Sequence, residues 1–228
     1  MNKWQDYEAQ AYTAMEQRDY RAAHLAFTHA IQLRQEHGDP DPPHTARLWN
    51  NVGALCRELG DIAAAQQAYD HALFLHRTVI ATPQSDCGIV LQNLGELALR
   101  RGDQEAAWAY FTEELDLWKQ LKDPTMIPHL ATCLHSLGEI MAAVEAYAPA
   151  RRNFEQALEL RELTLGDDQP ETADTLIQLG MVCRAQRDYA AARTYLTRAQ
   201  QLYIQALGAQ HPMVTKLQTI LTTLGVPN

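Results

Sequence analysis

The chain has 228 residues and a formal net charge of −9, from 19 Lys and Arg against 28 Asp and Glu. This acidic balance argues against binding to nucleic acid or to an anionic membrane surface, because both need a basic protein surface. The N-terminus (MNKWQDYEAQ) has no apolar segment typical of a signal peptide, and no apolar run approaches the roughly 18 residues that cross a bilayer. We therefore expect a cytoplasmic protein with no membrane insertion.

A pattern that begins near the N-terminus recurs along the whole chain. It is marked by Ala11, Gly53, Gly95, Gly138 and Gly180, which are separated by 42, 42, 43 and 42 residues. Self-similarity at a fixed period is the signature of a repeat architecture. The five predicted repeats occupy about 4–45, 46–87, 88–130, 131–172 and 173–213.

Each repeat contains two stretches with the apolar spacing of an α-helix. In the second repeat Trp49, Val52 and Cys56 mark one face of a first helix. Tyr69 and Ala72 mark one face of a second helix. The abundance of Ala and Leu over β-branched residues also favours helix over strand. We therefore predict one helix pair per repeat.

A short polar turn separates the two predicted helices. Gly60-Asp61 and Gly102-Asp103 combine a residue that tolerates the left-handed conformation with a residue that caps free helix amides. Arg18-Asp19 and Arg187-Asp188 repeat the turn without the glycine. Pro149 lies in the first turn of its predicted helix, where the missing N–H is not needed.

A further apolar pattern follows the fifth repeat. Leu217, Ile220, Leu221 and Leu224 recur at the spacing of one helix face. A lone helix at about 212–224 is what a repeat array needs to cover the apolar face of its last unit. We interpret it as a capping helix.

The small and aromatic positions of the repeats resemble the tetratricopeptide-repeat (TPR) family. The second repeat has Gly53, Ala65, Tyr69 and Ala72 at its positions 8, 20, 24 and 27, and the other repeats follow, with clear departures only at Glu114 and Leu196. The resemblance implies an all-α fold, a right-handed α-solenoid of five TPR helix pairs of about 42 residues plus a C-terminal capping helix. It also implies a single TPR domain over 1–228.

The repeats are longer than the 34 residues usual for a TPR. Linkers such as LGDDQPETADTL and LGAQHPMVTKL look like those of the kinesin light chain. The chain therefore resembles this long-repeat subtype, which is also found in scaffold and signalling proteins.

In TPR proteins the face of the first helix opposite its packing stripe lines a concave groove. The resemblance therefore nominates a set of polar side chains on that face as the partner-binding surface. These residues are Arg47, Asn50, Asn51, Arg57, Gln92, Asn93, Glu96, Arg100, His135, Ser136, Glu139, Gln178 and Arg184.

Four of these residues occupy position 6 of successive repeats: Asn51, Asn93, Ser136 and Gln178. An amide side chain donates and accepts at once, which suits the backbone of an extended peptide. Asn50-Asn51 also matches the paired Asn with which kinesin-light-chain repeats hold cargo peptides. The plain alternative is that these are solvated polar residues on an exposed helix face.

The predicted groove contains both basic and acidic side chains, which favour different partners. Its four Arg residues favour an acidic or phosphorylated partner segment, whereas neighbouring acidic residues weaken that preference. The carboxylate clamp of chaperone-binding TPRs is not expected, because no window of three repeats supplies its cations. No nucleic-acid partner is expected either.

The sequence contains no motif that indicates catalysis or the binding of a cofactor or metal. GxxxxGK[ST], GxGxxG, HExxH and GxSxG do not occur, and the nine His residues are dispersed without metal-ligand spacing. We expect no enzyme activity, no cofactor and no metal. We expect the four cysteines to be reduced and mostly buried thiols: Cys56, Cys87, Cys133 and Cys183. Among the four Trp residues we expect Trp108 to be partly exposed.

The leading functional hypothesis is a protein–protein interaction module that binds a partner peptide or protein segment in the concave groove, as a scaffold or regulatory adaptor. A second hypothesis is a ligand-responsive sensor or regulator that closes around a small peptide or metabolite. A third is a self-assembling structural protein. A homo-oligomer has no specific support in the sequence, and the identity of the partner lies outside what the sequence can say.

Overall fold

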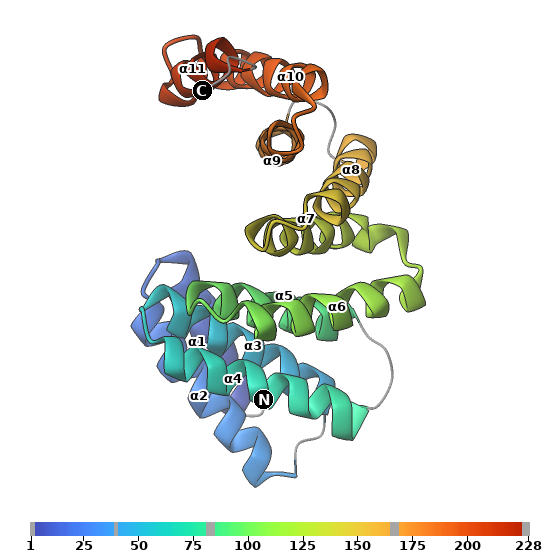
Figure 1. Ribbon diagram of the computed structural model, residues 1–228. Helices are drawn as coiled ribbons and strands as arrows, with labels where there is room; N and C mark the ends of the chain where they lie inside the picture. The colour runs from blue at the N-terminus through green and yellow to red at the C-terminus, as the bar shows by residue number, and fades with distance from the viewer. Residues whose placement is uncertain (1–2, 39–40, 81–84, 165–168, 225–228) are drawn as a thin grey trace. The chain divides into compact units, whose positions relative to one another are not determined.

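The structure, a computed structural model, describes residues 3–38, 41–80, 85–164 and 169–224 (Figure 1). The first four residues of the linker LGDDQPETADTL lie outside these ranges. In the described residues the chain forms helices and no strand, which confirms the predicted all-α class. The helices are α1 (Lys3–Glu16), α2 (Tyr20–Glu36), α3 (Pro42–Glu58), α4 (Ile62–Leu75), a π-helical turn η1 (His76–Ile80), α5 (Ser85–Arg100), α6 (Gln104–Leu121), a 3-10 turn η2 (Pro124–Met126), α7 (Ile127–Ala143), α8 (Tyr147–Thr164), α9 (Pro170–Ala185), α10 (Tyr189–Leu207) and α11 (Pro212–Thr223).

Consecutive helices pack as pairs: α1 with α2, α3 with α4, α5 with α6, α7 with α8, and α9 with α10. The chain divides into two compact units, Met1–Leu121 with the first three pairs and Lys122–Asn228 with the last two pairs and α11. Unit 1 and unit 2 are described separately below. The single domain over 1–228 stays a prediction.

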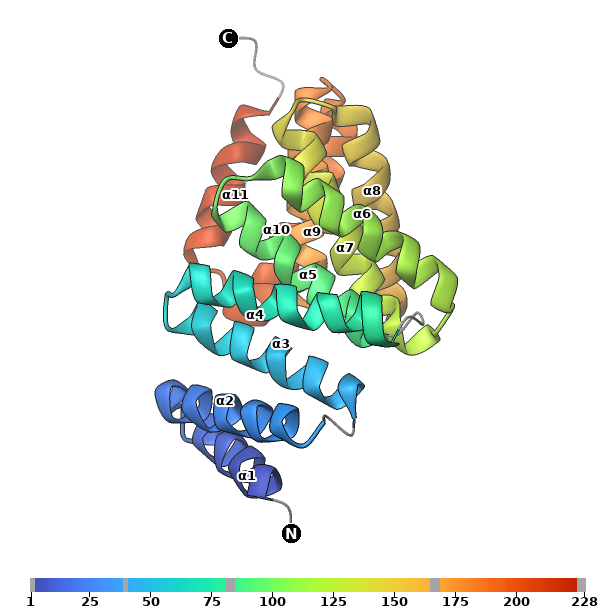
Figure 2. The same cartoon turned by 90° about the horizontal axis from the view of Figure 1, so that it is seen from below.

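In unit 1 the second helix of each pair contacts the first helix of the next, so α2 packs on α3 and α4 on α5. Figure 2 shows the three pairs following one another in chain order. Their shared core contains the fully buried aromatic rings Phe27 and Tyr69, with Leu48, Leu91 and Leu94 between the pairs. Each pair thus buries its apolar surface against its neighbour, as expected of a repeat array.

Gly53, Gly95 and Gly138 sit where a first helix touches the aromatic ring of its own second helix, and Gly180 meets Leu196 in the same place. A Cβ placed on Gly53 would lie 2.5 Å from the ring of Tyr69, and one on Gly95 would lie 2.6 Å from the ring of Phe111. Such distances are too short for carbon atoms, so glycine allows the two helices of a pair to approach. The aromatic at position 24 therefore packs within its own repeat.

The turns between paired helices share one left-handed residue. Gly60 and Gly102 have φ values of +81° and +76°, and Glu145 takes the same conformation with φ of +60°. Arg18 and Arg187 do so as well, with φ of 58° and 63°. The following Asp caps the second helix, since the Asp61 carboxylate accepts from the amide of Ala64 at 3.0 Å. The turn predicted from sequence is thus present with and without glycine.

Unit 2 ends with α11, which packs against α10. Leu217 and Leu221 of α11 are buried and join the core that contains Leu179 and Leu196. Leu224 is also buried, directly after the helix. The terminal helix therefore covers apolar side chains of the last pair, as a capping helix should.

Glu114 occupies a position at which the other four repeats have alanine, and its contacts explain the difference. Its side chain is fully buried, and the Trp118 indole N–H donates to Glu114 Oε1 at 2.8 Å. Trp118 in turn lies against Gly88, where an added Cβ would be 2.2 Å from the ring. Glu114, Trp118 and Gly88 thus form one interlocking variation of the repeat in α5 and α6.

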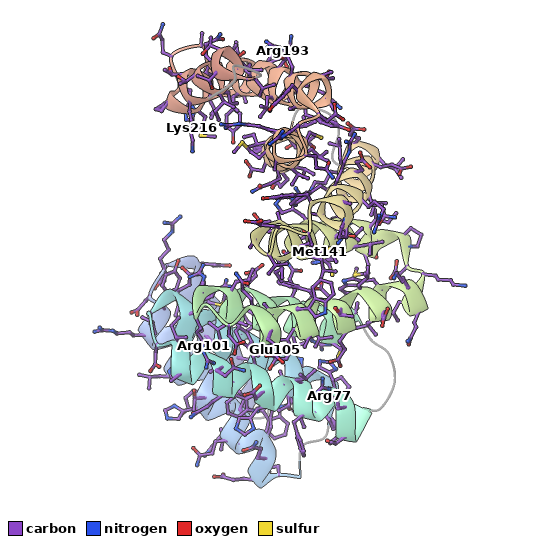
Figure 3. The ribbon with its side chains drawn as sticks, viewed as in Figure 1. Arg77, Arg101, Glu105, Met141, Arg193 and Lys216 are labelled. Carbon is purple, nitrogen blue, oxygen red and sulfur yellow. The ribbon has the colours of Figure 1, made fainter. Side chains whose placement is uncertain are left out.

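Long polar side chains from η1 and from the turn after α5 reach neighbouring second helices of unit 1. Arg77 in η1 donates to the Glu113 carboxylate of α6, and Arg101 donates to Gln66 of α4 at 3.3 Å. Figure 3 labels Arg77 and Arg101 among the side chains of unit 1. These surface links are exposed, so each contributes less than about 1 kcal/mol to stability.

The cysteines and Trp108 lie as the sequence predicted. Cys56, Cys133 and Cys183 are buried, Cys87 is half-buried, and all four are free. Trp108 is 38% exposed. Among the described helices none has both the length and the apolar character to span a membrane, and the described residues hold no cluster of three metal-ligating side chains.

Candidate functional site

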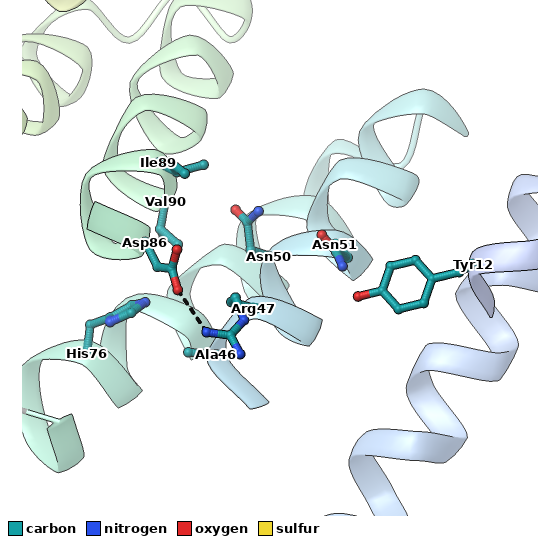
Figure 4. Close-up of a pocket in the computed structure, with 9 residues that line it drawn as sticks. All are labelled: Tyr12, Ala46, Arg47, Asn50, Asn51, His76, Asp86, Ile89 and Val90. Carbon is teal, nitrogen blue, oxygen red and sulfur yellow. Dashed lines mark hydrogen bonds and ion pairs between the residues drawn. The ribbon is translucent and has the colours of Figure 1, made fainter. Parts of the chain in front are cut away.

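A pocket of about 350 Å³ opens on unit 1 among the first helices of its three pairs (Figure 4). Tyr12 of α1 lies on one side of it, Arg47 and Asn50 of α3 lie in the middle, and His76 of η1 lies on the opposite side. The pocket is lined by Tyr12, Ala46, Arg47, Asn50, Asn51, His76, Asp86, Ile89 and Val90.

The polar residues of helix α3 face this pocket because the opposite face of the helix packs in the core. Leu48 and Val52 are buried, so the residues between them on the opposite face remain accessible. The helix is fixed at its start by Asp41, whose carboxylate accepts from the amide of His44 at 3.2 Å. Asn50 and Asn51 are half-buried at the resulting surface.

Five of the predicted residues form one hydrogen-bonded network across α3 and α5. Asn93 Nδ2 donates to Asn50 Oδ1 at 2.9 Å. Arg57 Nη1 lies 3.2 Å from Glu96 Oε2 and 3.4 Å from Asn93 Oδ1, and Gln92 Nε2 donates to Glu96 at 3.3 Å. The fold thus brings these side chains together, but it also engages them with one another.

The cationic charge predicted for this face is largely offset. Arg47 Nη1 lies 3.2 Å from Asp86 Oδ2, and Arg57 is paired with Glu96 and Glu58. Because two of the four Arg residues have carboxylate partners, the structure gives little support to a groove selective for acidic segments. Arg100 and Arg184 are exposed.

His76 is the unusual member of the pocket. Its side chain is 4% exposed, and neither ring nitrogen has a hydrogen-bond partner in the described part of the chain. Burial lowers the pKa of His76, the nearby Asp86 raises it, and Arg47 lowers it, with a net lowering. The imidazole is therefore neutral near pH 7, with one nitrogen able to accept and the other able to donate.

The predicted residues of unit 2 form a smaller group on α7 and α9. Gln178 Nε2 donates to Glu139 Oε1 at 3.2 Å, and His135 Nε2 lies 3.6 Å from the same oxygen. Ser136 is only 8% exposed, so it offers little surface to a partner. Ser136 is therefore less accessible than the other predicted position-6 residues, Asn51, Asn93 and Gln178, which are half-buried.

Sequence reasoning missed six of the nine pocket-lining residues, among them the polar or charged Tyr12, His76 and Asp86. Tyr12 and Asp86 belong to first helices. Tyr12 holds the repeat position of the nominated Glu96 and Glu139, but in the first repeat, where no residue is nominated, and Asp86 lies two residues before its repeat begins. His76 follows a second helix, whereas the predicted groove residues all lie on first helices. Its repeat position was the available signal, because Arg34 and Arg161 occupy the same position in other repeats. The partner-binding role of the nominated residues stays a prediction.

A model of the Tetratricopeptide repeat family matches residues 44–120, 89–163 and 129–205. These overlapping matches cover more than half of the chain. The fold of this family is one that supports protein-interaction modules. The recognition of TPR repeats from the sequence is therefore confirmed.

Similar proteins include a Clustered mitochondria protein homolog of Aspergillus clavatus, 22% identical over 182 residues. The match covers 80% of this chain, but the chain spans only 14% of that relative's length. BtubC (BKLC) from P. vanneervenii has a TM-score of 0.77 at 22% identity, with 91% of this chain and 82% of that chain covered.

The predicted kinesin-light-chain subtype has a counterpart among solved structures. A putative kinesin light chain with nearly identical TPR-like repeats from Podosopora anserina has a TM-score of 0.67 at 14% identity. The match covers 81% of this chain and 87% of that chain. At such identities these structures show a shared fold.

Proposed function

Because the chain belongs to the tetratricopeptide repeat family, we propose that it is an adaptor or scaffold that holds a segment of a partner protein. The segment lies against the polar faces of the first helices. Within unit 1 it crosses α1, α3 and α5, where the pocket opens.

The observation that carries this proposal is the make-up of the pocket wall. Arg47, Asn50 and Asn51, three residues that the repeat pattern nominates, line one pocket together. Asn51 is half-buried beside Tyr12, and its amide can donate to and accept from one peptide unit. A backbone held in this way leaves its side chains free to enter the pocket, where specificity resides.

The proposal is tested by affinity capture with the immobilised full chain, followed by binding measurements with the recovered partner. Asn51→Ala should weaken that binding about tenfold or more, as the loss of one well-placed hydrogen-bonding group does in a desolvated contact. Gln67→Ala is the matched control, because Gln67 is an exposed amide on the second helix α4. Equal effects of the two substitutions would contradict binding on the first helices.

A ligand-responsive regulator is the second candidate, and the enclosed His76 end of the pocket favours it over self-assembly. A small peptide or metabolite filling about 350 Å³ would contact all three helix pairs of unit 1 at once. Small-angle scattering of the full chain with and without the captured ligand separates the two functions. A rigid adaptor keeps its radius of gyration, whereas a regulator changes it.

A further inference from the structure

One position of the repeat carries a large side chain that reaches from the end of the second helix toward neighbouring elements. It is the thirty-first residue of each repeat. Its five occupants are Arg34, His76, Trp118, Arg161 and Tyr203.

In the first repeat this position is a buried arginine with several partners. Arg34 is 4% exposed, and its Nε donates to Thr45 Oγ1 at 2.8 Å. Its Nη2 donates to the carbonyl of Asp41 at 2.9 Å, and its Nη1 lies 3.5 Å from Glu8 Oε1. The guanidinium therefore joins α2 to α1 and to the start of α3, with acceptors on each side.

The fourth repeat places the same group in a matching setting. Arg161 is 5% exposed, and its Nη1 donates to the carbonyl of Glu171 at 2.6 Å and to the hydroxyl of Thr175. The same nitrogen lies 3.4 Å from His135 Nδ1. His135 holds the repeat position that Glu8 holds in the first repeat. The space beside position 31 is thus built for a guanidinium in two repeats.

The second repeat keeps this space and lacks its arginine. His76 is shorter than an arginine, both of its ring nitrogens are without a hydrogen-bond partner among the described residues, and the pocket lies beside it. Asn50 stands where Glu8 and His135 stand in the other repeats. Asp86 stands where Glu171 stands, and it adds a carboxylate to the pocket.

We propose that this pocket receives the guanidinium group of an arginine side chain from the bound partner segment, in the place that Arg34 and Arg161 fill in their own repeats. The inference rests on the proposed function, because it names the side chain that the bound segment presents. The partner's arginine then provides the cation that Arg34 and Arg161 provide in the first and fourth repeats.

The pocket wall offers what a guanidinium needs. The Asp86 carboxylate and the neutral imidazole of His76 are acceptors, and planar N–H groups bind such acceptors strongly. Ile89 and Val90 provide an apolar wall for the methylene stem. The net charge of −9 also favours approach of a cationic segment.

Arg47 holds the carboxylate when the pocket has no partner arginine. Its Nη1 lies 3.2 Å from Asp86 Oδ2, and its side chain is 49% exposed, so it can move outward when another guanidinium arrives. Arg47 therefore competes with the occupant. An acidic occupant would reverse this relation, because Arg47 would then be its anchor. The sign of the effect of removing Arg47 separates the two.

The test is a titration of the full chain, followed by the NMR signals of the His76 ring. The probes are N-acetyl-arginine N-methylamide, the matching citrulline and glutamate derivatives, and free L-arginine. We expect the arginine derivative to shift the His76 signals and to bind about tenfold more tightly than citrulline, which has the same shape without the charge. Preference for glutamate, or equal binding of citrulline, would overturn the proposal.

Single substitutions should change the affinity for the arginine derivative in predictable directions. Arg47→Met should tighten binding of the arginine derivative several-fold, while Asp86→Asn should weaken it about tenfold. His76→Arg should abolish it by filling the pocket from within, and His71→Arg, on the exposed side of α4, should leave it unchanged. Weaker binding by Arg47→Met, or unaltered binding by His76→Arg, would contradict the assignment.

Three outcomes distinguish the source of the arginine and separate the two proposals. Tighter binding of free L-arginine than of the capped derivative would overturn the assignment to a partner's side chain. If a captured partner depends on Asn51 but is indifferent to His76→Arg, the proposed function stands and the arginine subsite fails. If the subsite binds its probe and no partner depends on Asn51, the proposed function fails instead.

Discussion

At the scale of single residues, four of the five repeats place a glycine of the first helix against a large side chain of the second. Gly95 meets Phe111 at a distance that no Cβ could occupy, and Gly180 meets Leu196 in the same way. The small residue at position 8 is therefore required by packing between paired helices. Helix propensity alone would favour alanine there.

Gly95→Ala should destabilise the chain by roughly 1–2 kcal/mol. Overpacking costs about 1–3 kcal/mol, and the better helix propensity of alanine returns part of it. Phe111→Leu in the same chain should recover part of the loss, because leucine has less volume than the ring and can shift away from the added methyl group. Urea unfolding of the single and double variants measures this. No recovery in the double variant would show that the ring is not the cause.

His76 should make stability depend on pH. Burial lowers the pKa of His76 in the folded chain below its value near 6.5 in the unfolded chain, so the unfolded state binds the proton more readily. The stabilising contribution is therefore complete above about pH 6.5 and is lost as the pH falls through the lower folded pKa. His76→Gln should reduce the loss of stability between pH 7 and pH 5 in urea unfolding.

His129 supplies the control for this pH dependence. Burial also lowers the pKa of His129, which lies in unit 2. Its replacement by Gln should remove a different part of the same pH dependence, so the double variant should be flatter than either single variant. An unchanged slope in His76→Gln would mean that the imidazole is equally easy to protonate in both states.

At the scale of elements, each helix pair is built around one turn. The first helix ends with a left-handed residue, and the next Asp begins the second helix in four of the five pairs. The fourth turn has Glu145 and Ala146 instead. Its backbone still closes in the same way, because the amide of Ala146 bonds to the carbonyl of Met141 at 2.9 Å. The turn geometry is thus kept where its usual residues are absent.

Glu145→Gly should raise the free energy of unfolding by roughly 0.5–1 kcal/mol. A left-handed conformation costs an ordinary residue about 1–2 kcal/mol, and glycine loses part of that gain through its freedom in the unfolded chain. Thermal unfolding measures the shift, with Glu145→Ala as the control that keeps a side chain at φ of +60°. Equal stability of the Gly and Ala variants would rule out backbone conformation as the cause.

At the scale of the whole molecule, stability is a sum over neighbouring pairs. Each unit has its own hydrophobic core, and α11 closes the core of unit 2 with Leu217 and Leu221. In such an array a local defect weakens its neighbours more than distant repeats. The capping helix should therefore influence the last pair most strongly.

Leu217→Asp should test this locality. The leucine is 1% exposed, so a buried unpaired carboxylate should cost about 3 kcal/mol or more. Hydrogen exchange should show lost protection in α9 and α10 with little change in α1 to α4. Lys216→Asp, next to it on the exposed side, should leave exchange unchanged. Uniform loss along the chain would show one cooperative unit instead.

The sequence by itself determined the all-α class, the TPR family, the helix pairs and their turns. It could do so because these features depend on spacing within about 42 residues and repeat five times. It also nominated Arg47, Asn50 and Asn51, since the packing stripe of a helix fixes which residues face away from it.

Tertiary structure alone decided how the nominated residues are used. The network of Asn50 and Asn93, the pairing of Arg47 with Asp86 and the burial of His76 all join residues from different helices. Such contacts depend on the distance between helix axes, which no spacing within one helix encodes. The pocket lies beside His76, which holds the repeat position of Arg34 and Arg161, and only packing shows that space is open there.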